Sequence, residues 1–240
     1  EDPNQLCGYF LLPLLICIDK VAGKNKYRLI YIALIIAMIY ISFITGSRGG
    51  LAAVFVTIGV YSLVSVKGAG NKIKLIVSLL LVFAIFFTVL FPLLPESVLE
   101  RMKIETIIED RGSGRLDLWE TVYSAITESK TSLVFGYGLG STMYFLRKAG
   151  FSSTVAHNHW LQIWCDQGFI GLLLFLGVLL AGGLRNMDND RNITVSLFGM
   201  FVLSMSLTLY AFYKPFWNLL MMSSLNYEGG TVNWPQKLPL

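Results

Sequence analysis

Three short polar stretches interrupt an otherwise apolar sequence, and each carries side chains that bind or transfer charged groups. The first, residues 45–50 (TGSRGG), places Arg48 between two apolar runs. A charge at the end of a membrane helix is either functional or an anchor that extends to the lipid headgroups. The neighbouring glycines allow the main chain to approach a ligand closely. We therefore favour an anion site at Arg48, and an interfacial anchor is the alternative.

The second stretch, residues 111–119 (RGSGRLDLW), resembles the start of a helix. Ser113 is the predicted N-cap. The following apolar residues are spaced to form one stripe on a helix: Leu116, Trp119, Tyr123 and Ile126. Arg115 would lie in the first turn, where a cation is disfavoured unless an anion is bound. A helix N-terminus with a guanidinium group beside it is a good phosphate site. The alternative is that Arg115 pairs with one of three nearby carboxylates, those of Glu109, Asp110 and Asp117.

The third stretch, residues 156–162 (AHNHWLQ), contains the only two histidines of the chain. Two residues apart, they point to different sides of a helix and do not form the metal-binding pair of the i, i+4 type. His157 stands beside Asn158 where an apolar run begins, and imidazole is well suited to general-base chemistry near neutral pH. His159 is a possible substitute for it, while Asn158, Gln162 and Asp166 share one helical stripe. The alternative is a histidine that is merely tolerated at an interface.

A glycine-rich segment lies between the second and third stretches. Residues 136–141 (GYGLGS) do not match a dinucleotide-binding fingerprint, and no convincing strand precedes them. We predict a flexible turn that lines the site.

The elements that must position these residues are membrane helices. The chain has 240 residues, of which 55% are hydrophobic and 14% charged, with a mean hydropathy of +0.63; soluble domains carry about 25% charged residues. Long apolar runs predict an all-α, polytopic bundle of five to seven spans and exclude a water-soluble fold. The clear spans are residues 29–44, 51–66, 75–94, 170–184 and 193–213. Two weaker runs, 6–18 and 216–225, cross either fully or in part.

Basic residues in the short connections predict the orientation. They cluster in residues 19–28, 67–74 and 185–191, and positive charge in short loops is retained in the cytoplasm. Residues 1–94 are then membrane helices, 95–160 an extracytoplasmic loop with short helices that carries the site, 161–225 membrane helices and 226–240 a polar, disordered cytoplasmic tail. The net charge of +4 follows from this topology, so no nucleic-acid partner is expected.

The ends and the cysteines add two expectations. The chain begins without Met and without a signal-peptide pattern, so we expect a fragment that lacks earlier spans. Cys7, Cys17 and Cys165 are not arranged in pairs of the CxxC type. We therefore expect buried thiols rather than disulfides or a metal site.

The order of these motifs resembles the O-antigen ligase and polymerase superfamily of bacterial envelopes. The features are DPN before an early span, the TGSRG turn, then GRLDLW, FGYGLGS and HNHWLQIWCDQGFIG. The resemblance covers essentially the whole chain as the C-terminal portion of such a protein. Members of the superfamily carry more spans than this chain, so part of a donor groove would lie outside it.

This resemblance implies a multi-pass glycosyltransferase of the bacterial inner membrane. It would transfer a glycan from undecaprenyl pyrophosphate to an acceptor hydroxyl at the periplasmic or outer face, without a metal or other cofactor. The acceptor is another lipid-linked repeat unit in a polymerase and lipid A-core in a ligase; the modest loop slightly favours a polymerase. By resemblance, Arg48 and Arg115 hold the pyrophosphate and His157 acts on the acceptor, with support from Asn158, His159 and Gln162. Sugars would contact four aromatic residues: Trp119, Tyr137, Tyr144 and Trp160.

Two other classes of protein remain open. A polysaccharide transporter or flippase binds its substrate near the bilayer midplane, whereas the central thirds of the clear spans here carry no ionisable residue. A purely structural membrane protein would tolerate replacement of Arg48, Arg115 or His157 individually.

Overall fold

The computed structural model describes residues 3–23, 25–65, 68, 70, 73, 77, 84, 88–89, 91–187, 190–209, 213–228 and 231–233. The described part is helical, as predicted, except for one small antiparallel hairpin. Its strands are β1 (Asn226–Glu228) and β2 (Thr231–Asn233), with Asn226 opposite Asn233. The predicted span 75–94 lies almost entirely outside the described residues.

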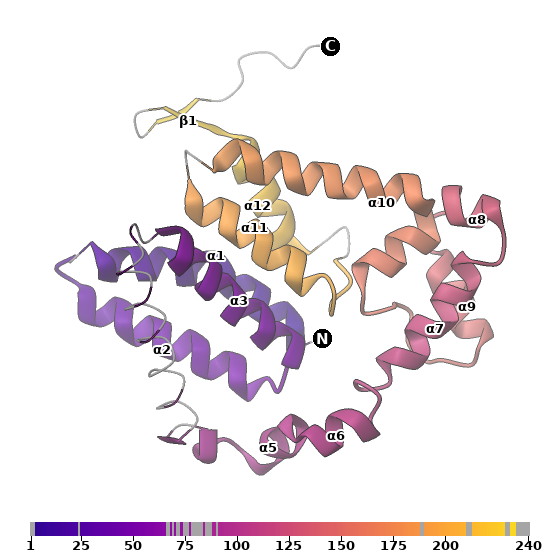
Figure 1. Cartoon of the computed structure of the whole chain (residues 1–240), viewed down its shortest axis with the longest axis horizontal. Helices are drawn as coiled ribbons and strands as arrows, with labels where there is room; N and C mark the ends of the chain where they lie inside the picture. Colours follow the sequence, from indigo (N-terminus) through magenta and orange to yellow (C-terminus); the bar gives the residue numbers. More distant parts are fainter. Residues whose placement is uncertain are drawn as a thin grey trace.

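Six helices form the bundle that underlies the site (Figure 1). They are α1 (Pro3–Ala22), α2 (Arg28–Ile44), α3 (Arg48–Ser65), α10 (His159–Asn186), α11 (Arg191–Leu203) and α12 (Lys214–Ser224). Helix α1 packs against α2, α3 and α11, while α11 also packs against α3, α10 and α12. Their shared core is apolar and fully buried, and includes Leu11, Leu14, Met200, Leu203 and Phe216.

Three of these helices are long and apolar enough to cross a membrane: residues 4–22, 48–65 and 159–186. The weaker run at residues 6–18 therefore belongs to a helix long enough to span the membrane, and this helix contains Pro13. The helix at residues 159–186 bends at Gly168, so its apolar part after the bend matches the predicted span 170–184. Helices α2 and α11 are apolar but shorter.

The predicted span 193–213 is too long, because α11 ends at Leu203. The hydroxyl groups of Ser204 and Ser206 bond back to the carbonyls of Phe201 and Leu203, at 2.6 and 3.2 Å. Serine hydroxyls that bond to the local main chain compete with helix continuation. The chain therefore turns at residues 204–206, and this serine turn contacts the site described below.

The interhelical segment, residues 91–158, carries the predicted short helices. They are η2 (Phe91–Leu93), α5 (Glu96–Met102), α6 (Ile104–Glu109), α7 (Arg115–Ile126), α8 (Lys130–Phe135) and α9 (Ser141–Lys148). Helices α7, α8 and α9 gather at the N-terminal end of α10 (Figure 1). There Leu118, Val122, Ile126 and Leu146 form a second core with Cys165. Val98 of α5 packs on Phe43 and Leu51, which attaches α5 to the ends of α2 and α3.

Two glycines make the bend in α10 possible. A Cβ at Gly168 would lie 2.2 Å from the Val134 carbonyl oxygen, and one at Gly136 would lie 2.5 Å from the Gly168 nitrogen. Both residues also have positive φ, of 70° and 71°. Only glycine allows this close contact of two main chains, so the glycines bring the end of α8 against the bend.

Candidate functional site

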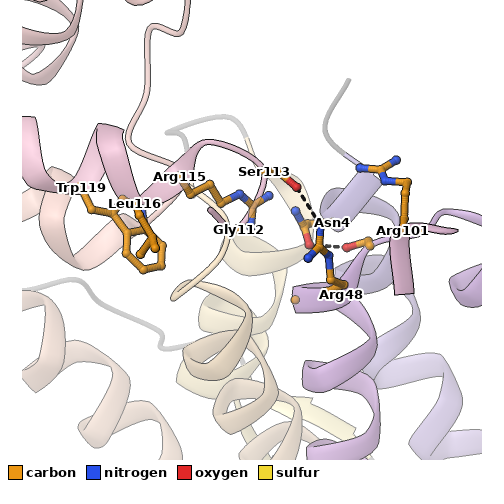
Figure 2. Close-up of a pocket in the computed structure, with 11 residues that line it drawn as sticks. Asn4, Arg48, Arg101, Gly112, Ser113, Arg115, Leu116 and Trp119 are labelled. Carbon is orange, nitrogen blue, oxygen red and sulfur yellow. Dashed lines mark hydrogen bonds between the residues drawn. The ribbon is translucent and has the colours of Figure 1, made fainter. Parts of the chain in front are cut away.

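A cavity of about 250 Å³ lies where α3 and α7 begin and α5 ends (Figure 2). Its walls include three arginines, Arg48, Arg101 and Arg115, and the main chain of Gly46, Gly49 and Gly112. The remaining lining residues are Asn4, Ser47, Ser113, Leu116 and Trp119. Two arginines selected from distant motifs in the sequence thus lie in one cavity.

Arg48 joins the first turn of α3 to the loop before α7. Its Nη2 donates to Asp110 Oδ2 at 2.5 Å and to Ser113 Oγ at 3.1 Å. The Ser113 N–H in turn donates to Asp110 Oδ1 at 2.8 Å. This N–H bond first, and then Arg48, holds the pKa of Asp110 below its ordinary value. Asp110 is therefore a carboxylate at neutral pH and orients Arg48 towards the cavity.

Ser113 is not the N-cap of α7, contrary to the prediction. Gly114 occupies that position with φ of 73°, and no side chain caps the helix. Arg111, Gly112 and Ser113 also have positive φ, so the four residues form a left-handed turn in which two glycines lower the conformational cost. The Ser113 groups that would cap a helix instead contact Arg48 and Asp110, and the uncapped start of α7 borders the cavity.

The predicted apolar stripe on α7 is half right, because Trp119 and Ile126 pack in the second core but the other two residues do not. Leu116 and Tyr123 are exposed, whereas Leu118, Val122 and Ile126 are buried against α9 and α10. Both sets of residues repeat at helical spacing, so periodicity alone could not choose between them. The tertiary packing of α7 selects the second set, and Leu116 is left at the cavity.

The Arg115 side chain extends from the start of α7 towards Arg48 and Asn4 in Figure 2. Two of the carboxylates that we considered as its partners bind other arginines. Asp110 binds Arg48, and Asp117 binds Arg111 with 2.9 Å between Nε and Oδ1. Arg115 lines the cavity, so its guanidinium group is placed where it can contact a bound anion.

Arg101 is a cavity residue that sequence reasoning missed. It comes from the last turn of α5, and its side chain lies over Gly46, with Cδ and a terminal nitrogen both 3.6 Å from where a Cβ would be. Gly46 has φ of 61°, so the turn between α2 and α3 requires glycine there. The one sequence feature that could have identified Arg101 is its positive charge near the start of the interhelical segment.

Asn4 is the second residue that was missed as part of the site, although its motif contributed to the resemblance. Its side chain is 3% exposed and connects three elements. Nδ2 donates to the Ser206 carbonyl at 3.4 Å, and Oδ1 accepts from the Gly50 N–H at 3.0 Å and from the Ser47 hydroxyl. Asn4 therefore fixes the start of α3, which carries Arg48, to α1 and to the serine turn.

His157 is not among the residues that line the cavity, but it is connected to them. The neighbouring Ala156 carbonyl accepts a 2.9 Å hydrogen bond from the indole of Trp119, which does line the cavity. His157 is half-buried and has a positive φ of 49°. Such a conformation is uncommon for a residue with a side chain and points to a constrained position.

The residues proposed to support His157 hold the chain around it. Asn158 caps α10 by accepting from the N–H groups of Trp160 and Leu161, at 3.1 and 3.2 Å. Gln162 accepts from the Ala156 N–H at 3.4 Å and from the Thr208 hydroxyl at 3.1 Å. Both side chains thus position the main chain on either side of His157.

His159 and Trp160 belong to the helix bundle. The His159 ring packs edge-on against Phe175 with 4.8 Å between ring centroids, and its buried Nδ1 has no hydrogen-bond partner among the described residues. Trp160 packs against Phe175 and Phe201 and donates to Ser204 Oγ at 2.8 Å. A sugar contact at Trp160 is therefore not supported, and the choice of His157 as the base stays a prediction.

The glycine-rich segment 136–141 is a fixed loop rather than a flexible turn. The Asp166 carboxylate, only 4% exposed, accepts from the Gly140 N–H and from the N–H and hydroxyl of Thr142, at 2.9 to 3.1 Å. The N–H groups of Tyr137 and Gly138 bond to α10 carbonyls at 2.9 Å. Of the predicted polar stripe, Asp166 alone stabilises the loop, together with carbonyl groups of α10.

All three cysteines are buried and free, as predicted. Among the described residues, no three histidine, cysteine or acidic side chains gather in a way that could hold a metal ion. Whether the chemistry is metal-independent stays a prediction.

Comparison with known proteins gives one match. The family model described as O-antigen ligase matches residues 33–176, a range that includes Arg48, Arg101, Arg115 and His157. No curated protein and no solved structure matches the chain. The matched range is more than half of the chain and contains all but Asn4 of the site residues. This chain belongs to the O-antigen ligase family and is an integral membrane protein of the O-antigen ligase or polymerase type.

Proposed function

We propose that this protein transfers a glycan from undecaprenyl pyrophosphate to an acceptor hydroxyl on the extracytoplasmic face of the bacterial inner membrane. The observation that carries the proposal is the meeting of Arg48, Arg101 and Arg115 at one cavity beside the start of α3. One guanidinium group can bind two phosphate oxygens through two parallel N–H hydrogen bonds. Three of them near a helix N-terminus suit a pyrophosphate with several negative charges.

The three arginines would accelerate the reaction by stabilising the leaving group. Negative charge develops on the pyrophosphate as its bond to the sugar breaks, and cations already held in place stabilise that charge without reorganisation. Arg48 is held by Asp110 and Ser113. In this mechanism the donor phosphate would either bind Arg48 in addition to Asp110 or replace Asp110 as the partner of Arg48.

His157 would act as the general base. The acceptor oxygen forms a bond to the anomeric carbon on the side opposite the pyrophosphate, while the bond from that carbon to the phosphate oxygen breaks. The acceptor proton passes to the imidazole, and undecaprenyl pyrophosphate leaves. The anomeric configuration is inverted, and no covalent enzyme intermediate is required. The Ala156–Trp119 hydrogen bond supports this role because it ties the His157 segment to the cavity.

The acceptor would be another lipid-linked repeat unit or lipid A-core, and we retain a slight preference for the repeat unit. The alternative of a polysaccharide transporter or flippase predicts a substrate site near the bilayer midplane. The three cavity arginines instead lie at or beside helix ends. Such positions favour chemistry at the membrane surface.

Complementation of a strain that lacks the native gene tests the proposal. The full-length protein would carry Arg48→Ala, Arg115→Ala or His157→Ala, and surface glycan would be scored as a gel ladder with membrane levels measured by blot. Each variant should insert normally and lose the ladder. Arg147→Ala, an exposed arginine on α9, is the matched control and should retain it.

The residual products identify the acceptor. A single repeat unit on lipid A-core indicates a lost polymerase, whereas a full-length glycan left on its lipid carrier indicates a lost ligase. Normal ladders from all three variants would contradict the enzymatic proposal and favour transport or a structural role.

A further inference from the structure

A second hollow, of about 560 Å³, shares no lining residue with the cavity of Arg48, Arg101 and Arg115, which we call the arginine cavity. Its walls include Glu128, which follows α7, together with Tyr137, Leu139, Tyr144 and Lys148. We call this hollow the aromatic groove. Tyr137 and Tyr144 are two of the four aromatic residues that the family resemblance implies as sugar contacts.

The aromatic groove has a fixed shape. Phe145 packs edge-on against Tyr137 and Tyr144, with 4.8 and 5.3 Å between ring centroids. The Tyr137 hydroxyl donates to Glu128 Oε2 at 2.6 Å. Asp166 fastens the loop that forms the other wall, as described above. A binding surface that is already ordered loses little entropy when a ligand is bound.

The side chains of the aromatic groove combine apolar and charged contacts. The Tyr144 ring is 60% exposed and Leu139 is 89% exposed. Glu128 and Lys148 are also exposed on the same hollow, and Lys148 Nζ lies 6.0 Å from the Tyr144 ring centroid. A pyranose ring offers the matching groups, because its C–H face packs on an aromatic ring and its hydroxyls bond to carboxylate and ammonium groups.

The position of the aromatic groove suits an extended saccharide. Arg115 is at the first residue of α7, whereas Glu128 lies just beyond its last turn. The 12 residues of α7 span roughly 18 Å at the rise of an α-helix. A ligand that reaches from the arginine cavity to the aromatic groove must therefore be several sugar units long.

A lipid surface is the competing occupant, because exposed aromatic and leucine side chains also insert into membrane interfaces. The carboxylate of Glu128 on the same hollow opposes insertion, since a carboxylate is costly to place in hydrocarbon. A concave surface is also unnecessary for an anchor, whereas small-molecule and saccharide sites are concave with a few polar groups.

We propose that the aromatic groove is a saccharide-binding subsite that holds the glycan chain at a distance from the arginine cavity. The assignment of a glycan as ligand rests on the proposed function, but binding at the groove is independent of transfer. Tyr144 provides the stacking surface, and Glu128 and Lys148 select for the hydroxyl pattern of the sugar.

Ligand-observed saturation-transfer NMR on the full-length protein in detergent tests the proposal. The probe is the surface glycan of the source bacterium, released from lipid by mild acid and separated by length. Tyr144→Ala should weaken its binding roughly fivefold, in line with the loss of one aromatic stacking partner. Tyr27→Ala removes an exposed tyrosine that also has a lysine over its ring, outside the groove, and should leave binding unchanged. Unchanged affinity in Tyr144→Ala would overturn the proposal.

Two further measurements separate the possible failures. Arg48→Ala should keep its affinity for the released glycan while losing transfer, so loss of transfer chemistry alone would not remove groove binding. A nitroxide on Leu139→Cys reports the surroundings of the groove in liposomes, because the three native cysteines are buried. The label should be accessible to a water-soluble relaxation agent and become less so with glycan. A label that is shielded from water and accessible to oxygen would place the groove in lipid and refute the subsite.

Discussion

The two glycines Gly49 and Gly59 lie in the same helix, α3, and should respond oppositely to alanine. A Cβ on Gly49 would lie 2.0 Å from Ser206 Oγ and 2.4 Å from Ser206 Cβ, whereas nothing lies within 4 Å of a Cβ on Gly59. Overpacking of this kind costs about 1 to 3 kcal/mol. Replacing a helical glycine with alanine without a clash gains roughly 0.5 to 1 kcal/mol. The two variants should thus differ by about 1.5 to 4 kcal/mol in stability.

The Gly49→Ala clash should also affect function, because Gly49 follows Arg48 and the displaced turn includes the Asn4 contacts. Thermal unfolding in detergent measures stability, and the surface glycan ladder measures function. Gly49→Ala should unfold at a lower temperature and weaken the ladder, while Gly59→Ala should match or exceed the wild type in both. The double variant Gly49→Ala/Ser206→Gly removes the clashing atoms and should recover stability. Equal behaviour of the two single variants would refute the packing of α3 on the serine turn.

Three further predictions concern single contacts. Asp166→Asn removes the charge that accepts several buried hydrogen bonds, so it should destabilise the α8–α9 loop by about 1 to 3 kcal/mol. The loop should then be cleaved faster by proteases, and resistance equal to that of the wild type would contradict the role of Asp166. The pKa of Asp110 is lowered in the folded state. Its contribution to stability is therefore fully present above its unfolded pKa and is lost only as the pH falls through the lowered value. A carboxyl NMR titration should show the lowered pKa, and a pKa at or above the ordinary value of 3.8 would contradict the contact with Arg48. Arg101→Ala should weaken donor binding at least as much as Arg115→Ala, whereas Arg147→Ala should not; donor affinity unchanged in Arg101→Ala would remove Arg101 from the site.

Much of the site could be predicted because its chemistry is local in sequence. Arg48 and Arg115 each stand beside glycines at a boundary between polar and apolar segments. Charged residues are costly in such places unless they are used, and both arginines do line the cavity. His157 and Asn158 were chosen by their position before an apolar run, and their roles in catalysis stay predictions. The long apolar helices followed from composition alone.

What failed depended on contacts between distant segments. Asn4 and Arg101 reach the cavity only because α1 and α5 pack beside α3, and no local pattern distinguishes them. Half of the stripe on α7 was misassigned, because Leu116 and Tyr123 share the helical period with Leu118 and Val122, which are the ones that pack in the second core. The loop at residues 136–141 was expected to be flexible because of its glycines. Its rigidity comes from Asp166, 25 residues later than Ser141.

In the C-terminal region, too, the predictions failed where individual hydrogen bonds decide the structure. The length of α11 was overestimated because residues 193–213 are apolar on average, while the serine hydroxyls that end the helix act through local hydrogen bonds. The tail was expected to be disordered, but residues 226–228 pair with residues 231–233 as a hairpin. Residues 234–240 lie outside the described part of the chain.

The most direct test of the central claim is to separate donor binding from transfer in the purified full-length protein, reconstituted in nanodiscs with a lipid-linked glycan donor. Donor affinity and single-turnover transfer would be measured for the wild type, His157→Ala, His159→Ala and the combined replacement of Arg48, Arg101 and Arg115 by alanine. We expect the triple variant to lose donor binding, and His157→Ala to bind the donor normally without transferring the glycan. His159→Ala should retain transfer if it folds. Normal transfer by His157→Ala, or normal donor binding by the triple variant, would refute the proposed mechanism.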